Sequence, residues 1–173
     1  MAEFVYSLTF DDYLGFEKFK LKRNKTSFFS YIMCLFFIAM GVYDAVVYKN
    51  IYLVFIAGIM VLFGVATSFY SLKIAPKKRV KNLLSLDSTY LCQNRAVIDD
   101  KAIEISNIPK ENQAGIVAVY PYSVMSVIYE TADCYYFFIA TEVKILPKRV
   151  IPPELSDYVK KVISKNKNYL FIK

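Results

Sequence analysis

The feature that most constrains this chain is an apolar run of 46 residues, from Ser27 to Leu72, in which only Asp44 and Lys49 are charged. To bury such a run, a soluble chain of 173 residues would need a larger core than its remaining residues could build. The run also starts too late and lasts too long to be a cleaved signal peptide. The sequence therefore predicts a membrane protein.

The same run is too long for one span, because a single helix of this length would extend about 69 Å, more than twice the apolar thickness of a bilayer. Divided at Lys49 and Asn50, it yields two segments, 27–48 and 51–72. Each segment can cross about 30 Å of hydrocarbon, and asparagine is a favoured turn residue. We therefore expect a two-helix transmembrane hairpin with the KN pair at its tip.

Basic residues flank both ends of this predicted hairpin and orient it. One group precedes the first span, and a second follows the last span at Lys73, Lys77, Lys78, Arg79 and Lys81. Because basic flanks favour the cytoplasmic side, we expect both termini inside the cell and the tip outside. The second group could also attract anionic lipids, at about 1 kcal/mol per basic residue near the surface.

The net charge of +7 does not indicate a nucleic-acid-binding domain. Residues 82–173 carry eleven basic and ten acidic side chains, so the excess of positive charge lies beside the apolar run. A surface that binds nucleic acid would need that excess on the folded domain itself. We therefore expect no nucleic-acid partner.

Small residues recur four apart in both predicted spans, at Gly41 with Ala45 and at Gly64 with Ser68. Such pairs allow helices to approach closely in lipid. In an antiparallel hairpin these pairs lie near opposite membrane faces, so one or both could face a second copy of the chain. The alternative is a chance scatter of small residues in apolar helices.

Asp44 is an ionisable residue within a span, which by default suggests a functional role. It lies only five residues before Lys49, about 7.5 Å along a helix, so its carboxylate can reach the outer interface. A transport site would need several converging polar groups, and only Tyr52 is polar in the facing segment 52–56. The sequence favours an interfacial carboxylate, with a transport role as the alternative.

The remaining segments predict an α+β arrangement. A strand and an amphipathic helix are expected within 1–26, a basic juxtamembrane helix or linker over 73–88, and an antiparallel β-domain over 89–173. The domain closes with an amphipathic α-helix that begins near Pro153. Strands closed by one C-terminal helix make a pleckstrin-homology-like arrangement. The apolar tail NKNYLFIK either adds a strand or enters the membrane interface.

One strand of this domain, CYYFFIA, has aromatic side chains on both faces. One face belongs to the core, and the other either packs within the domain or meets a partner. The candidate partner surface consists of Tyr135, Phe137, Lys148 and Arg149.

The residues of several catalytic chemistries are absent from this sequence. Without histidine, Ser-His-Asp and Cys-His catalysis and histidine-based metal sites are impossible. The five glycines are not clustered into a phosphate-binding loop. The three cysteines form neither a CxxC pair nor a disulfide framework. We expect no enzyme activity, no metal and no cofactor.

The segments FVYSLTFDDYLGF and VIYETADCYYFFIATEVKILPKRVIPPELSDYVKKVI, with the two spans between them, resemble the YcxB-like family of small bacterial membrane proteins. The resemblance covers nearly the whole chain and is most specific over 127–163. It implies a multi-pass protein of the bacterial cell (inner) membrane with no known enzymatic role. In architecture alone the chain is also similar to membrane-tethered pleckstrin-homology-like immunity proteins.

Three functions follow as hypotheses. The first is a non-catalytic adaptor or scaffold whose cytoplasmic domain binds a protein partner or the membrane surface. The second is an immunity-type protein that protects against a membrane-active peptide toxin. The third is a small transport or channel subunit, which depends on Asp44.

The predicted orientation can be tested at the tip. A Lys49→Cys variant should react with a membrane-impermeant maleimide added outside intact cells, because the KN pair is expected to face out. The parent chain serves as the control for its three native cysteines. An unlabelled Lys49→Cys variant would rule out the predicted hairpin.

Overall fold

The computed structural model describes residues 1–23, 26–47, 49, 51–86, 92–108, 117–140 and 142–172; within these ranges the side chains of 26–31, 51 and 53 are not described. The chain forms two compact units: Met1–Tyr13 with Leu84–Lys173, and Leu14–Leu83. Asn50 of the predicted tip and the domain start at 89 lie outside the described residues.

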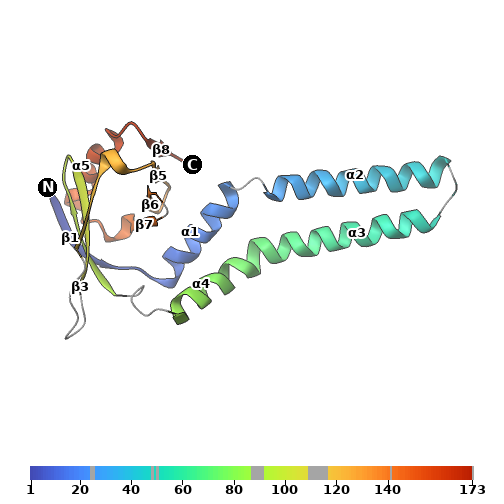
Figure 1. Ribbon diagram of the computed structural model, residues 1–173, viewed down its shortest axis with the longest axis horizontal. Coiled ribbons are helices and arrows are strands. Elements are labelled where there is room, and N and C mark those ends of the chain that lie inside the picture. The colour runs from blue at the N-terminus through green and yellow to red at the C-terminus, as the bar shows by residue number, and fades with distance from the viewer. Residues whose placement is uncertain are drawn as a thin grey trace. The chain divides into compact units, whose positions relative to one another are not determined.

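The first sheet combines the N-terminal strand with three strands from the second half of the chain (Figure 1). Its order is β1 (Ala2–Ser7), β2 (Gln93–Ile98), β3 (Ala102–Ile108) and β4 (Val117–Pro121), all antiparallel. The N-terminal segment predicted to stand apart from the domain therefore supplies one of its strands. The physical reason is the alternation of Ala2, Phe4 and Tyr6, which are buried on one face.

The second sheet has the order β7 (Glu142–Pro147), β6 (Cys134–Ile139), β5 (Val127–Glu130) and β8 (Tyr169–Phe171). Strand β8 runs parallel to β5, whereas the other pairs are antiparallel. Of the two alternatives for the apolar tail, the added strand is therefore the one observed. The sequence predicted an all-antiparallel domain, and the parallel pair of β5 and β8 shows that this prediction is wrong at that position.

The expected closing helix, α5 (Pro153–Ser164), packs into the core with the two sheets. Its buried residues Val159, Val162 and Ile163 join Phe4, Ile98, Ile103, Ile128 and Phe137 in one apolar cluster. The Tyr6 hydroxyl also donates to the Ile145 carbonyl at 3.5 Å, which links β1 to the second sheet. The α+β class is confirmed.

The second unit is helical and begins within α1 (Phe10–Arg23). It continues through α2 (Thr26–Val47), α3 (Ile51–Phe69), a π-helical turn at Tyr70–Ile74, and α4 (Ala75–Leu86). The wide turn comes just before Pro76, which lacks an N–H group and crowds the preceding turn of an ordinary α-helix. A π turn relieves that crowding, so the helix continues through the proline.

By length and composition, one helix among the described residues could cross a membrane, at 54–86, and the apolar stretch 32–47 is shorter. The predicted two-span hairpin therefore stays a prediction. Lys49 has a φ of 52°, in the left-handed region that a single turn residue adopts where a chain reverses. Helices α2 and α3 then lie side by side, and we call them the helical pair (Figure 1).

The seam of the helical pair is made mostly of small side chains, with Phe37 as the large exception. Its less exposed positions alternate three and four apart, as in a coiled coil, at Cys34, Phe37, Gly41 and Asp44 on α2 and at Ala57, Val61, Gly64 and Ser68 on α3. Ala45 is also half-buried. The predicted small residues therefore belong to this seam rather than to an outer face that awaits a second copy.

Two glycines on α3 make a matched test of the seam. A Cβ built at Gly64 would lie 2.5 Å from the Cys34 Sγ, whereas a Cβ at Gly58 meets nothing within 4 Å. We expect Gly64→Val to lower the free energy of unfolding by about 1–3 kcal/mol through overpacking. Gly58→Val should be close to neutral, because a Cβ there meets nothing within 4 Å and valine forms helices no worse than glycine. Thermal unfolding of the purified chain in detergent measures both, and equal effects would contradict this packing.

Candidate functional site

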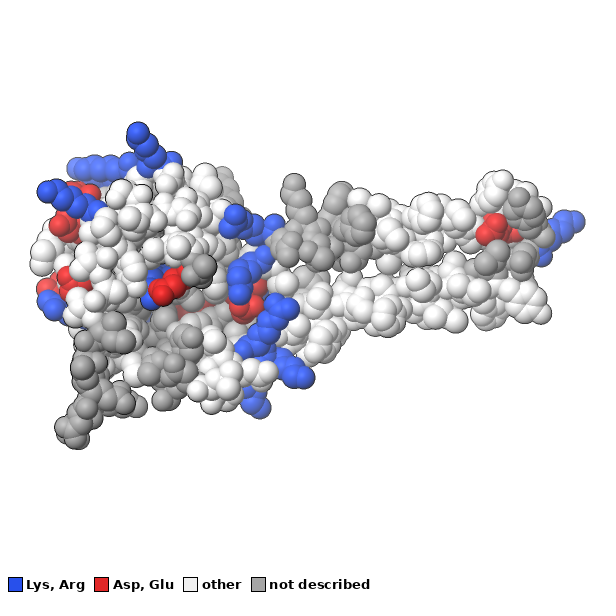
Figure 2. Space-filling view, in the orientation of Figure 1, with Lys and Arg blue, Asp and Glu red and all other residues white. Residues whose placement is uncertain are grey.

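The basic residues predicted to lie beside the membrane are on the exposed surface of α4 and of the π turn that precedes it. A second exposed group lies on α1, and Figure 2 shows basic side chains over both helices. Glu17 of α1 joins the groups, because its carboxylate contacts Lys20 and lies 3.6 Å from the Arg79 guanidinium. We call the set the basic collar: Lys18, Lys20, Lys22, Arg23, Lys73, Lys77, Lys78, Arg79 and Lys81.

The prediction of a partner surface that includes Tyr135 and Phe137 is wrong, because both side chains are buried. Tyr135 is 3% exposed and Phe137 is fully buried, so neither can offer a docking surface. Both lie on β6, a central strand of the second sheet, whose two faces are covered. The sequence left packing within the domain as an alternative, and that alternative is the one observed.

The two basic members of that predicted surface are engaged within the domain. Arg149 donates to the Asp12 carboxylate and, at 3.3 Å, to the Thr9 hydroxyl. Asp12 is buried and also accepts the Thr9 backbone N–H at 2.7 Å, which forms a capping box at the start of α1. Arg149 therefore fixes the first turn of α1 against the β-domain.

Lys148 belongs to a second polar cluster, around Glu130. Glu130 is 2% exposed, and its carboxylate accepts from the Lys148 ammonium at 2.5 Å and from the Tyr169 hydroxyl. Burial alone would raise the pKa of this carboxyl, but these two hydrogen bonds and the nearby positive charges outweigh burial and lower it. Tyr169 begins β8, so its bond to the carboxylate ties the C-terminal strand to β5, and the Ile172 N–H adds a backbone bond to the Glu130 carbonyl.

Several large apolar side chains on edge strands of the domain are exposed. They are Val5 on β1, Val117 and Val119 on β4, and Leu170 and Phe171 on β8. The sequence indicated these strands but not which were edges, because edge position depends on strand order. These residues are more accessible to a partner than Tyr135 and Phe137 are.

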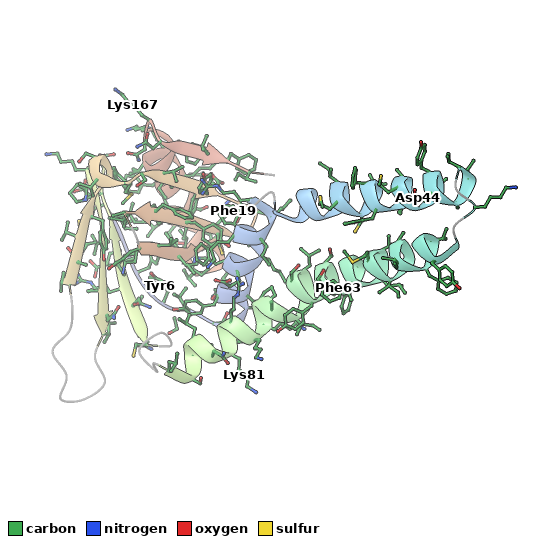
Figure 3. All side chains as sticks on the ribbon, turned by 45° about the vertical axis from the view of Figure 1, so that its right-hand side comes forward. Tyr6, Phe19, Asp44, Phe63, Lys81 and Lys167 are labelled. Carbon is green, nitrogen blue, oxygen red and sulfur yellow. The ribbon has the colours of Figure 1, made fainter. Side chains whose placement is uncertain are left out.

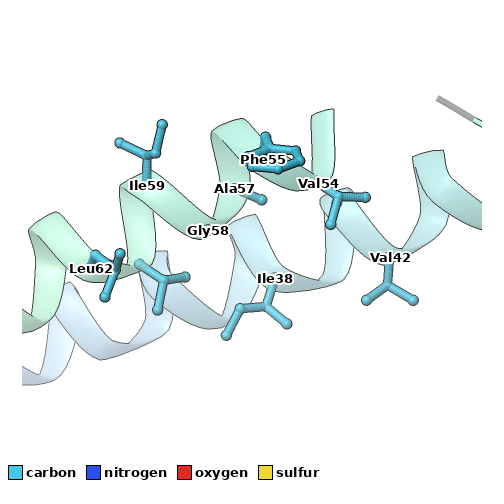
Figure 4. A pocket seen from close by; sticks show the side chains of 10 residues that line it. Ile38, Val42, Val54, Phe55, Ala57, Gly58, Ile59 and Leu62 are labelled. Carbon is cyan, nitrogen blue, oxygen red and sulfur yellow. The ribbon is translucent and has the colours of Figure 1, made fainter. Parts of the chain in front are cut away.

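Among its described residues the helical pair has a depression on each side of its seam. A shallow apolar groove of about 840 Å³ is lined by Ile38, Val42, Phe55, Gly58, Ile59 and Leu62, among others (Figure 4). A smaller pocket of about 210 Å³ is lined by Phe36, Phe37, Met40, Gly41, Asp44, Ile56 and Ala57. Asp44 is half-buried there, near the far end of α2 (Figure 3).

The described residues contain no group of three or more histidine, cysteine, aspartate or glutamate side chains that could hold a metal ion. Burial raises the pKa of the Cys134 thiol to about 11, so this side chain is protonated at neutral pH. A protonated thiol is a poor nucleophile.

Comparison with known proteins identifies no relative: no family model, no curated protein and no solved structure matches this chain.

The Glu130 cluster predicts a selective effect on β8. Glu130→Gln should lower the free energy of unfolding by about 1–3 kcal/mol and accelerate hydrogen exchange over 165–172, because the charged acceptor is lost. Glu142→Gln is the control, since its exposed ion pair with Lys144 should contribute less than about 1 kcal/mol.

The pH dependence has a defined sign. Because the folded pKa of Glu130 is lowered from 4.5, its stabilisation is present at neutral pH and is lost as the pH falls through the folded pKa. The parent chain should therefore lose free energy of unfolding as the pH falls. The loss should be smaller in Glu130→Gln. Equal exchange in the parent chain and Glu130→Gln would contradict the assigned role.

Proposed function

We propose that this chain is a non-catalytic, membrane-anchored binding protein. In this proposal α2 and α3 cross the membrane as a hairpin, and the α+β unit binds a protein partner or the membrane surface in the cytoplasm. The observation that carries the proposal is the exposed apolar surface of the helical pair, where Leu35, Phe55 and Leu62 are 66%, 70% and 71% exposed. Contiguous apolar surface of this extent suits lipid and not water.

Strand pairing supports two crossings rather than one. Ser7 at the end of β1 pairs with Gln93 at the start of β2, so the intervening chain leaves the sheet and returns to the same place. A segment that begins and ends on one side of a membrane crosses it an even number of times. Helices α2 and α3 supply two crossings, and the left-handed Lys49 supplies the reversal.

The basic collar supports a cytoplasmic location for both ends of this segment. Both of its helices lie at the ends of the proposed hairpin that are remote from Lys49, where positive charge favours the cytoplasmic side. The collar is also suited to anionic headgroups, since its nine basic side chains are all exposed.

The two four-stranded sheets closed by α5 support a pleckstrin-homology-like domain, as the resemblance to the YcxB-like family implies. The proposed contact surface comprises the edge strands β4 and β8, with Val119 and Phe171 exposed. An edge strand can accept a strand of another protein through its free backbone groups. The proposed adaptor role therefore rests on these two edge strands. The proposed membrane is the bacterial inner membrane.

An immunity-type role is the second candidate, favoured by the half-buried Asp44 carboxylate near the proposed outer tip. Membrane-active peptides are commonly basic and amphipathic, so a carboxylate in an apolar pocket could hold one. A transport role has less support, because every other residue lining that pocket is apolar.

The adaptor proposal predicts a pattern of photo-crosslinks in native membranes. A photoreactive residue at Val119 or Phe171 of the full chain should yield a discrete band with a second protein, because both side chains are exposed. The same residue at Leu62, which is proposed to face lipid, should not. Alkaline carbonate extraction of the same membranes should leave the chain in the pellet. Crosslinks to the chain alone would contradict the adaptor role, whereas crosslinks to lipid alone would contradict a protein partner and favour binding to the membrane surface.

A further inference from the structure

The strongest unexplained feature of the helical pair is the pocket in front of Asp44. Asp44 is the sole acidic residue between 18 and 86 in the sequence. Its pocket of about 210 Å³ is lined otherwise by apolar side chains and Gly41. No basic side chain forms an ion pair with Asp44 among the residues that the structure describes, including Lys49.

The pocket extends away from the tip. On α2 its lining residues precede Asp44, and the most distant, Phe36, lies eight positions earlier, which is about 12 Å along the helix. On α3 the lining residues are Ile56 and Ala57, beyond the first turn. The open space beside the carboxylate is therefore bordered by apolar side chains on the side of Asp44 that is remote from Lys49.

A carboxylate in such surroundings favours a cation beside it. Placing an unpaired charge within a membrane span is energetically unfavourable, and a partner charge offsets this cost. The Phe36 and Phe37 rings, 6.0 Å apart, present aromatic surface to the same space, and aromatic faces attract ammonium and guanidinium groups.

We propose that this pocket receives the lysine or arginine side chain of a partner helix that lies in the membrane. The inference rests on the proposed insertion of α2 and α3. The partner is an otherwise apolar helix with one basic residue in the outer half of the membrane. Phe36, Met40 and Ile56 are exposed around the pocket and provide the apolar contact, while Gly41 allows close approach.

A second copy of the chain does not fit this description. Between 26 and 72 the sole basic residue is Lys49, which lies at the tip and not at the depth of the pocket. The required cation must therefore come from another molecule. The charge of Asp44 thus selects a helix of different sequence.

The test uses the full chain in phosphatidylcholine nanodiscs, where anionic lipid cannot act through the collar. The probe is a synthetic leucine-alanine helix with one lysine six residues from its outer end, and its control has norleucine at that position. Energy transfer between labelled chain and probe should show at least tenfold tighter binding of the lysine helix. In Asp44→Asn the two helices should bind alike.

Two further variants make the result specific to the pocket. Asp44→Lys should prefer a helix with glutamate at the same position, a reversal that a structural role for Asp44 would not produce. Val42→Asn, on the opposite side of the seam, should retain the lysine preference. The proposal would be overturned if the parent chain bound the lysine helix and the norleucine helix equally. It would also be overturned if energy transfer between two labelled copies of the chain depended on Asp44. Protease treatment of the reconstituted chain shows whether α2 and α3 are inserted, because inserted helices are protected from cleavage. Equal binding of both helices by a protected chain overturns the pocket proposal, whereas loss of protection would mean that the proposed insertion itself had failed.

Discussion

The pairing of β1 with β2 is the constraint on which the rest of the structure depends. These strands are neighbours in one sheet but are separated by more than 80 residues of sequence, and those residues contain all of α1 to α4. The helical segment is in effect an insertion between two adjacent strands. Both of its ends are held at one place, so it must reverse direction.

The helical pair differs from the β-domain in which side chains it buries. In the domain, apolar burial between two sheets and α5 provides the stabilisation. In the helical pair, most large apolar side chains point outward and mostly small ones fill the seam, as is typical of helices whose solvent is lipid. The proposed membrane anchor is supported by this inversion, together with the shared position of the two ends of the helical segment at the β1–β2 pair.

Polar clusters join the sequence-distant parts of the domain. Arg149 and Asp12 fix the start of α1, and Glu130 with Lys148 and Tyr169 secures the last strand. Both clusters use basic residues that the sequence suggested for partner contact. Their internal roles shift the proposed contact surface to the exposed edges β4 and β8, and leave Asp44 as the charge on which the proposed partner helix depends.

The sequence by itself determined the element types: the long apolar run, the turn at Lys49, the closing helix after Pro153 and most strands follow from local periodicity and composition. It could not determine strand order, because register and edges arise from contacts between segments that are distant in sequence. Only the tertiary structure therefore placed β1 in the first sheet, buried Tyr135 and Phe137, and set Gly64 against Cys34. Burial and close approach are properties of neighbours in space, which local sequence does not specify.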